Sequence, residues 1–206
     1  MTRCGAAVLC GGQSRRMGEP KAWLPFGGER LLQRVVRLVA TAAEPIIVVA
    51  APDQPLPELP ATVAVARDPI AGRGPLQGLS TGLAALPDSV ELIFATGTDS
   101  PLLKPAWITR LVDLIGDHDL AIPFVAGFHH PLSAVYRRAA TIPAIDRLLA
   151  ADRLRATDLV ELLHTRIVTA DELREVDPDL ATLRNINTPE DYQAALAAAG
   201  FGSVTR

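Results

Sequence analysis

The sequence predicts an α/β protein in which a mostly parallel sheet is covered by helices on both faces. Short apolar runs, rich in β-branched residues, alternate with segments whose apolar residues recur at helical spacing. Strands that are connected through helices run parallel, and a parallel sheet is buried on both faces. With 206 residues, the chain is long enough to bury a sizeable core. We therefore expect a single-domain, three-layer α/β/α architecture.

Each expected strand is a short apolar run, and the expected helices carry apolar stripes or helix-starting residues. The first helix has apolar residues at positions 31, 32, 35, 36, 38 and 39, and Pro105 suits the first turn of another helix. The strands are expected over residues 6–10, 45–51, 62–66, 91–95 and 120–124, and the helices over 29–43, 74–86 and 105–116. Ligands of such sheets bind beyond the carboxyl ends of the strands.

Composition and charge are typical of a soluble enzyme and argue against two classes of partner. Aromatic residues make up only 4% of the chain, which leaves few platforms for stacking bases. The formal net charge is −3 and no basic run is present, so neither nucleic acid nor an anionic membrane is expected as a partner. No apolar stretch approaches the roughly 20 residues of a membrane span, and no signal peptide is evident. We expect a cytoplasmic location.

The two cysteines are not expected to form a disulfide. Cys4 and Cys10 lie on or beside one predicted strand, and six extended residues span roughly 20 Å. That separation exceeds what disulfide geometry can bridge. Cys10 is interpreted as a small buried thiol.

The stretch from residue 8 to residue 21 is the most informative part of the chain. An apolar run ends there in two glycines, and a loop that contains two arginines follows and closes on Lys21. Glycines let backbone N–H groups approach an anion closely, and the three cationic side chains can neutralise a polyphosphate. The loop is therefore suited to a nucleoside triphosphate.

Three familiar phosphate loops do not match this stretch. The P-loop requires Gly-Lys-Ser/Thr, whereas Lys21 follows Pro20 and precedes Ala22. Dinucleotide and kinase loops require G-x-G-x-x-G, and the glycines here have another spacing. The pattern present is L-x-G-G-x-S-x-R-M-G-x-P-K, which resembles the signature loop of nucleotidyltransferases with the glycosyltransferase-A type fold.

Two aspartates follow predicted strands and are candidate metal ligands. Asp68 comes after the run that ends at Arg67, and Asp99 comes shortly after residues 91–95. A carboxylate there, beside a proline-fixed turn, is well placed to bind a hard cation through oxygen. The alternative is an aspartate that bonds its own loop backbone. Beside a phosphate loop we favour the metal-binding interpretation, and Asp99 is the better candidate.

Further motifs extend the resemblance over residues 5–195. After the signature loop come Asp68-Pro…Gly-Pro-Leu-x-Gly, Asp99-Ser-Pro, His130-Pro-Leu-Ser-Ala-Val-Tyr and Asn185-Ile-Asn-Thr-Pro-Glu-Asp. This order resembles the molybdenum cofactor (molybdopterin) guanylyltransferase family, and the last motif favours molybdopterin. The last motif is also typical of the start of a helix, with Thr188 as the N-cap.

The resemblance implies a Rossmann-like nucleotide-diphospho-sugar transferase fold over residues 1–206, with a nucleotide-binding half near 1–100 and an acceptor-binding half near 101–199. It implies transfer of GMP from GTP to molybdopterin cofactor with release of pyrophosphate, dependent on Mg²⁺. Transient contact with molybdenum cofactor assembly proteins fits such a role.

The resemblance also implies roles for individual residues. The implied catalytic residues are Lys21, Asp99 and Arg16, and Asp99 is the implied metal ligand. Nucleotide binding is implied for Leu9, Cys10, Gly11, Gly12, Ser14, Arg15, Lys21, Asp68 and Asp99. Acceptor binding is implied for His130, Pro131, Asn185 and Asn187.

One position differs from the family pattern, so the sequence does not decide which nucleotide base is bound. An Asn often contacts the nucleotide after the second strand, but this chain has Ala50-Ala51-Pro52. Main-chain groups of residues 9–11 can still read guanine, so we expect GTP to be preferred. The alternatives are a cytidylyltransferase that acts on the same cofactor or on a sugar or polyol phosphate, and a non-catalytic nucleotide-binding regulator.

Overall fold

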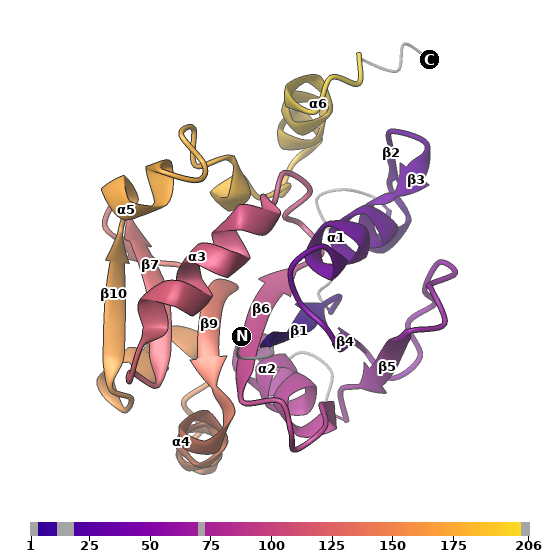
Figure 1. The fold of residues 1–206 in the computed structure, drawn as a ribbon. Helices are drawn as coiled ribbons and strands as arrows, with labels where there is room; N and C mark the ends of the chain where they lie inside the picture. The colour runs from indigo at the N-terminus through magenta and orange to yellow at the C-terminus, as the bar shows by residue number, and fades with distance from the viewer. Residues whose placement is uncertain (1–3, 12–18, 70–72, 203–206) are drawn as a thin grey trace.

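The computed structural model describes residues 4–11, 19–69 and 73–202, and it confirms the predicted α/β class (Figure 1). An eight-stranded sheet forms the middle layer, and a two-stranded hairpin lies outside it. The strands are β1 (Cys4–Leu9), β2 (Pro25–Phe26), β3 (Glu29–Arg30), β4 (Ile46–Ala50), β5 (Val63–Arg67), β6 (Leu92–Gly97), β7 (Leu120–Val125), β8 (Phe128–His129), β9 (Ser133–Arg137) and β10 (Thr165–Thr169).

Helices occupy both faces of this sheet and its upper end in Figure 1. The α-helices are α1 (Leu31–Ala40), α2 (Gly74–Ala85), α3 (Pro105–Ile115), α4 (Arg138–Ala150), α5 (Ala170–Arg174) and α6 (Pro189–Ala198). Three short 3₁₀ helices are η1 (Lys21–Trp23), η2 (Ala156–Glu161) and η3 (Ala181–Leu183). Among the described residues, no helix has the length and apolar character needed to cross a membrane.

The strand order brings the carboxyl ends of most strands to one edge. The order is β10-β7-β9-β6-β1-β4-β5, with β8 paired to the end of β7. β1 is parallel to β4 and β6, while β9 runs antiparallel between β6 and β7. Leu9 at the end of β1 is therefore level with Gly97 at the end of β6. We call this the carboxyl edge, and β9 begins at it.

Apolar side chains on the two faces of the sheet form two separate core layers. On one face, Val8 and Phe94 pack with α1, α3 and α5. On the other, Ala7 and Ile93 pack with α2, α4 and η2. This alternation is what a strand buried on both faces requires, because neighbouring side chains point to opposite sides. A third cluster joins α6 to the β2–β3 hairpin through Phe26 and Leu196.

The structure shortens the first expected helix and adds elements. Residues 29 and 30 belong to the β2–β3 hairpin, so α1 begins only at Leu31. Gly27 and Gly28 have φ of 62° and 87°, a conformation that glycine adopts without strain, and they allow the chain to reverse before the helix. The strands β9 and β10 and the helix α4 were not among the expected elements.

The cysteine prediction is confirmed. Cys4 and Cys10 are both buried free thiols. Burial raises the pKa of the Cys4 thiol to about 12, and burial also raises the pKa of Cys10 above its usual value. Both side chains therefore stay protonated at neutral pH and act as small apolar groups.

Candidate active site

The carboxyl edge gathers the residues that the sequence analysis singled out. Cys10 and Gly11 follow β1, Asp68 follows β5, and Asp99 lies two residues beyond β6. The peptide N–H of Asp68 donates to the carbonyl of Ala50 at 2.8 Å, which extends the pairing of β4 and β5 by one residue. Asp68 and Asp99 therefore share an edge with the start of the phosphate loop.

Lys21 is at the centre of a polar group that joins three distant segments. It is the first residue of η1, and its Nζ donates to Oδ1 of Asn187 at 3.0 Å. The same Nζ lies 3.4 Å from Oδ2 of Asp99. The side chains of Lys21 and Asp99 are 21% and 25% exposed, so solvent or a ligand can reach both. We call Lys21, Asp99 and Asn187 the transfer triad.

Gly97 makes room for the Asp99 carboxylate. A Cβ atom built at position 97 would lie 2.4 Å from Oδ1 of Asp99. The main chain of Asp99 is fixed as well, because its carbonyl accepts a bond of 2.9 Å from the N–H of Ile186. The sequence analysis missed Gly97. Its signal was a glycine at the end of an apolar strand, where the backbone is approached closely.

Asn185 and Asn187 are brought to the same place by the start of α6. Oδ1 of Asn185 accepts from the Ser100 hydroxyl at 3.1 Å. The N–H of Asn187 donates to Oδ2 of Asp191 at 2.9 Å, and this carboxylate also accepts from the N–H of Thr188. These backbone N–H groups hold the pKa of Asp191 below its usual value.

The predicted helix start is confirmed, because the Thr188 side chain accepts from the N–H of Asp191 in a capping box. One motif thus both begins a helix and supplies the Asn187 side chain to the triad.

Gln54 fixes the loop after β4 to the end of β1. Its Nε2 donates to the carbonyl of Cys10 at 2.9 Å, and its Oε1 accepts from the N–H of Ala51 at 3.2 Å. Arg67 strengthens this loop by donating to the carbonyls of Ala51 and Gln54 at 3.0 and 2.7 Å. The sequence analysis missed Gln54, since it stands in a proline-rich connector without a motif. Gln54 places a polar side chain next to residues 50–52, where this chain lacks the asparagine that is frequent in the family.

Some main-chain groups expected to read the base are already used within the fold. The N–H of Cys10 donates to the carbonyl of Val49 at 2.7 Å, and the Leu9 carbonyl accepts from the N–H and hydroxyl of Thr98. The two bonds from Thr98 use both lone pairs of the Leu9 carbonyl oxygen, and the Cys10 N–H has only one hydrogen to give. The Cys10 N–H is therefore not available to a nucleotide in this arrangement.

His130 and Pro131 lie at the carboxyl edge but apart from the triad contacts. The His130 N–H donates to the Pro123 carbonyl at 3.0 Å, and the Tyr136 hydroxyl donates to the Pro131 carbonyl at 2.7 Å. Desolvation by burial lowers the pKa of His130. Its Nε2 is buried without a hydrogen-bond partner among the described residues. The imidazole is therefore neutral at physiological pH.

Four of the expected site residues, Gly12, Ser14, Arg15 and Arg16, lie outside the described residues.

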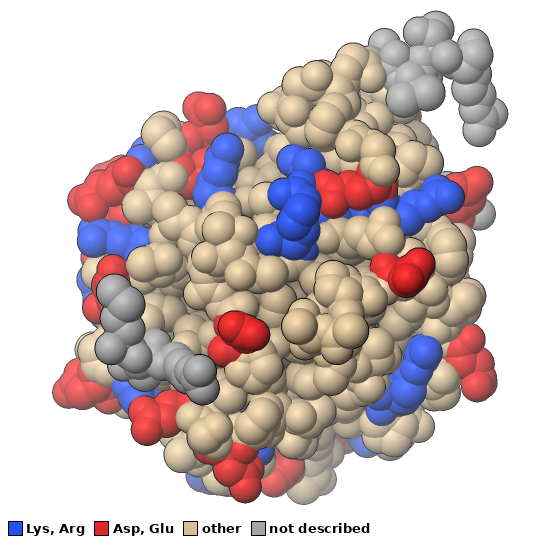
Figure 2. Space-filling model, turned by 45° about the vertical axis from the view of Figure 1, so that its right-hand side comes forward, with Lys and Arg blue, Asp and Glu red and all other residues tan. Residues whose placement is uncertain are grey.

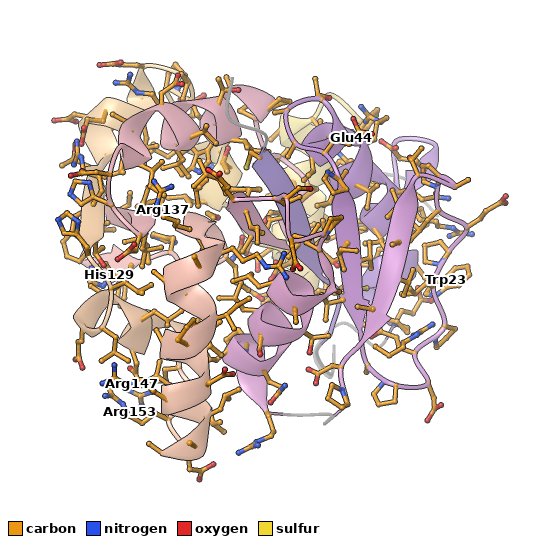
Figure 3. All side chains as sticks on the ribbon, turned by 60° about the horizontal axis from the view of Figure 1, so that its bottom comes forward. Trp23, Glu44, His129, Arg137, Arg147 and Arg153 are labelled. Atoms are coloured by element: carbon orange, nitrogen blue, oxygen red, sulfur yellow. The ribbon has the colours of Figure 1, made fainter. Side chains whose placement is uncertain are left out.

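Charged side chains elsewhere are engaged locally. On the face shown in Figure 2, basic and acidic residues are interspersed. Figure 3 shows Arg147 and Arg153 together near the end of α4, with Trp23 on the far side of the molecule. Arg153 pairs with Asp158 and Glu161 at 2.9 and 3.0 Å. Arg153 therefore forms surface ion pairs with its neighbours and is not part of the triad.

Comparisons with known proteins identify the family of this chain. Residues 6–166 match the family model of the MobA-like NTP transferase domain. A probable molybdenum cofactor guanylyltransferase of Mycolicibacterium paratuberculosis is 37% identical over 196 residues, which cover 93% of this chain and 94% of the relative. The molybdenum cofactor guanylyltransferase of Desulfosudis oleivorans is 34% identical over 96% of both chains.

A solved structure has the same fold. The molybdopterin-guanine dinucleotide biosynthesis protein A of Archaeoglobus fulgidus superposes with a TM-score of 0.79 at 22% identity, over 95% of this chain and 98% of that one. The family model and the two sequence relatives lead to one assignment: this chain belongs to the MobA-like NTP transferase family.

Proposed function

We propose that this protein transfers GMP from GTP to molybdopterin cofactor, forming the guanine dinucleotide and releasing pyrophosphate. The observation that carries the proposal is the transfer triad, in which the Lys21 ammonium contacts both Asp99 and Asn187. Lys21 is also the last residue of the signature motif. Relatives that are 34% and 37% identical and named guanylyltransferases supply the substrate class.

The reaction depends more on neutralising negative charge than on proton transfer. The acceptor phosphate is already an anion near neutral pH, so its oxygen can attack the α-phosphorus without a strong general base. Repulsion between two anions and the charge that builds on the leaving pyrophosphate must be overcome. The Lys21 ammonium is suited to both tasks, because a fixed cation stabilises the charge that develops in the transition state.

The residues present fit a magnesium ion. Oxygen ligands suit this hard cation, and the Asp99 carboxylate and the Asn187 amide oxygen both face Lys21 at the open edge. Asp99 would hold the ion, which would supply charge neutralisation along the triphosphate. Lys21 now occupies the space between these oxygens. We propose that it turns to the phosphates when the nucleotide binds.

The nucleotide and the acceptor approach from different parts of the same edge. In our proposal the loop after β1, with Gly12, Ser14, Arg15 and Arg16, holds the triphosphate, and Asp68 lies on the nucleoside side. His130, Pro131 and Asn185 contact the acceptor. The whole chain acts as one domain with a nucleotide half near residues 1–100 and an acceptor half near 101–199.

A cytoplasmic location is part of the proposal. Cys4 and Cys10 are free thiols, which are typical of a reducing compartment. Delivery of the pterin through transient contact with cofactor assembly proteins is compatible with this location.

The test is a direct assay of product formation. Purified protein is incubated with molybdopterin cofactor, Mg²⁺ and one of the four nucleoside triphosphates, and the dinucleotide and pyrophosphate are measured. We expect product with GTP, and none with GTP when Mg²⁺ is chelated. Product with CTP in place of GTP would make the protein a cytidylyltransferase. Binding of GTP without product in any combination would favour the non-catalytic regulator.

A further inference from the structure

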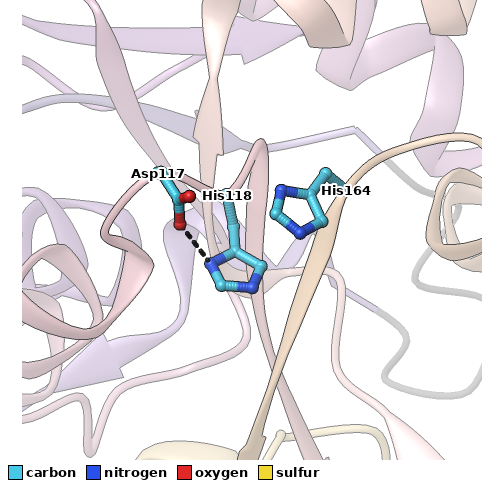
Figure 4. A group of neighbouring side chains, drawn as sticks. All are labelled: Asp117, His118 and His164. Atoms are coloured by element: carbon cyan, nitrogen blue, oxygen red, sulfur yellow. Dashed lines mark ion pairs between the residues drawn. The ribbon is translucent and has the colours of Figure 1, made fainter.

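Two histidines and an aspartate meet far from the transfer triad, at the edge where β7 and β10 begin (Figure 4). Asp117 and His118 lie between α3 and β7, and His164 directly precedes β10. One carboxylate oxygen and one ring nitrogen from each histidine lie within 4.8 Å of one another. We call these three residues the amino-edge cluster.

The backbone holds the two halves of the cluster in place. β7 and β10 are parallel neighbours, with Thr165 opposite Leu120. Just before these strands, the N–H of Asp119 donates to the carbonyl of His164 at 2.8 Å, and the N–H of His164 donates to the Asp119 carboxylate at 3.2 Å. The N–H of His118 bonds to the Ile115 carbonyl at 2.9 Å. The cluster is therefore positioned by the fold before any ligand binds.

One distance within the cluster matches the separation of two ligands on a metal ion. Nδ1 of His118 lies 3.3 Å from Oδ1 of Asp117. Two ligands with bonds of about 2.0–2.1 Å to a tetrahedral zinc ion are roughly 3.4 Å apart. The His164 ring stacks on the His118 ring with centroids 4.1 Å apart. Because imidazole binds a metal in the plane of its ring, the stacked His164 ring must rotate to share a metal with His118, and the broad χ2 torsion of histidine permits this rotation.

Two carboxylates and one guanidinium lie at the cluster. The carboxylates of Asp117 and Asp119 lie at the cluster, while Arg137 donates to the backbone carbonyls of His118 and Gly116 at 3.1 and 2.7 Å. Nδ1 of His118 also lies 3.1 Å from the Ile115 carbonyl. A metal bound there would replace that hydrogen bond.

We propose that Asp117, His118 and His164 bind a borderline divalent transition metal, for which Zn²⁺ is the probe, with water completing the coordination. Imidazole nitrogen with one carboxylate is a donor set for zinc, whereas the oxygen donors of the triad suit magnesium. The bound metal connects the turn after α3 to β10 and stabilises that side of the sheet. This site is separate from the proposed transferase reaction.

The test is zinc titration of the full chain after treatment with a chelator. The Asp99→Asn background is used throughout, so that binding at the triad does not contribute. We expect one zinc ion per chain, a rise in Tm with zinc, and visible absorption of a tetrahedral site with Co²⁺. His118→Ala and His164→Ala should each weaken zinc binding by about tenfold or more, and Asp117→Asn by less.

His129→Ala is the matched control, because this partly buried histidine, labelled in Figure 3, is in β8 and pairs with the end of β7, whereas the cluster lies at the start of β7. Its zinc affinity should equal that of the parent. Zinc binding that persists unchanged in both His118→Ala and His164→Ala would overturn the proposal, and so would a parent protein that binds no zinc. Circular dichroism and urea unfolding of each variant separate loss of the ligand from loss of the fold.

Discussion

The carboxylate of Asp99 occupies space that exists only because residue 97 has no side chain. A Cβ atom at Gly97 would lie 2.4 Å from Oδ1 of Asp99, well inside van der Waals contact. Gly97 ends β6 level with Leu9, so its backbone cannot move without disturbing the central pairing of the sheet. The orientation of Asp99 toward Lys21 therefore depends on a glycine two residues earlier.

Gly97→Ala should lower the turnover rate strongly while the fold persists. The added methyl group must displace the Asp99 carboxylate, and misplacing a catalytic group by about 1 Å can cost roughly 10²-fold in rate. We expect the rate of guanine dinucleotide formation to fall by about this factor, with little change in the far-ultraviolet circular dichroism. Gly202→Ala, where an added Cβ meets open space, is the control. Full turnover in Gly97→Ala would show that the carboxylate position is not critical.

Asp99→Asn tests the charge at the same position. The amide keeps the shape of the side chain but removes the negative charge that would hold Mg²⁺. Turnover at saturating GTP should fall by roughly 10² or more, the scale of losing one strong electrostatic stabiliser. Stability should change little, because this partly exposed loop carboxylate contributes little to the core. Steady-state kinetics at several Mg²⁺ concentrations check this, and unchanged kinetics would make Asp99 a structural residue.

Lys21→Ala separates transition-state stabilisation from nucleotide binding. If the ammonium acts mainly on the transferring phosphates, kcat should fall more than GTP affinity does. Calorimetry with GTP and single-turnover kinetics measure the two quantities. Lys104→Ala is a control for loss of one lysine outside the triad. The mechanistic role is wrong if Lys21→Ala loses GTP binding but retains its rate at saturation.

Gln54→Ala should weaken nucleotide binding with little effect on kcat. The substitution removes the donor to the Cys10 carbonyl and the acceptor of the Ala51 N–H. Leaving such groups unpaired costs about 1–3 kcal/mol, so KM for GTP should rise by roughly tenfold. Gln33→Ala, in α1, is the matched control, because its side chain bonds to Glu58 and Arg30 instead. Equal KM values for the two variants would contradict a positioning role for Gln54.

Asp191 predicts a pH dependence of stability at the start of α6. Hydrogen bonds from the N–H groups of Asn187 and Thr188 lower its pKa in the folded protein below the ordinary value of 3.8. A lowered carboxylate pKa stabilises the folded state above the ordinary value, and that contribution is lost as pH falls through the folded pKa. Asp191→Asn should therefore destabilise the protein at neutral pH, and the difference should shrink below pH 3.8.

Urea unfolding at several pH values measures this difference. Glu190→Gln, one residue earlier on the first turn of α6, is the control for removing an acidic charge there. A destabilisation by Asp191→Asn that is the same at all pH values would show that the carboxylate charge plays no part.

The sequence by itself determined the fold class and the helix start at Thr188. These features depend on residues that are close in the chain. Apolar runs such as 45–51 predict a buried strand, and Thr188-Pro189 satisfies the first turn of a helix from within its own segment. Asp99 could be placed at the carboxyl edge for the same reason, because it follows a strand of a parallel sheet.

Only the tertiary structure decided which of these residues touch. Lys21 and Asn187 are 166 positions apart, and they meet where α6 packs on Phe26 in the hairpin after η1 and the N–H of Ile186 bonds to the Asp99 carbonyl. The antiparallel insertion of β9 and the bond from Gln54 to Cys10 likewise depend on distant segments. Such contacts are set by packing of the whole chain, where burial of apolar faces outweighs local preference, so no local pattern contains them.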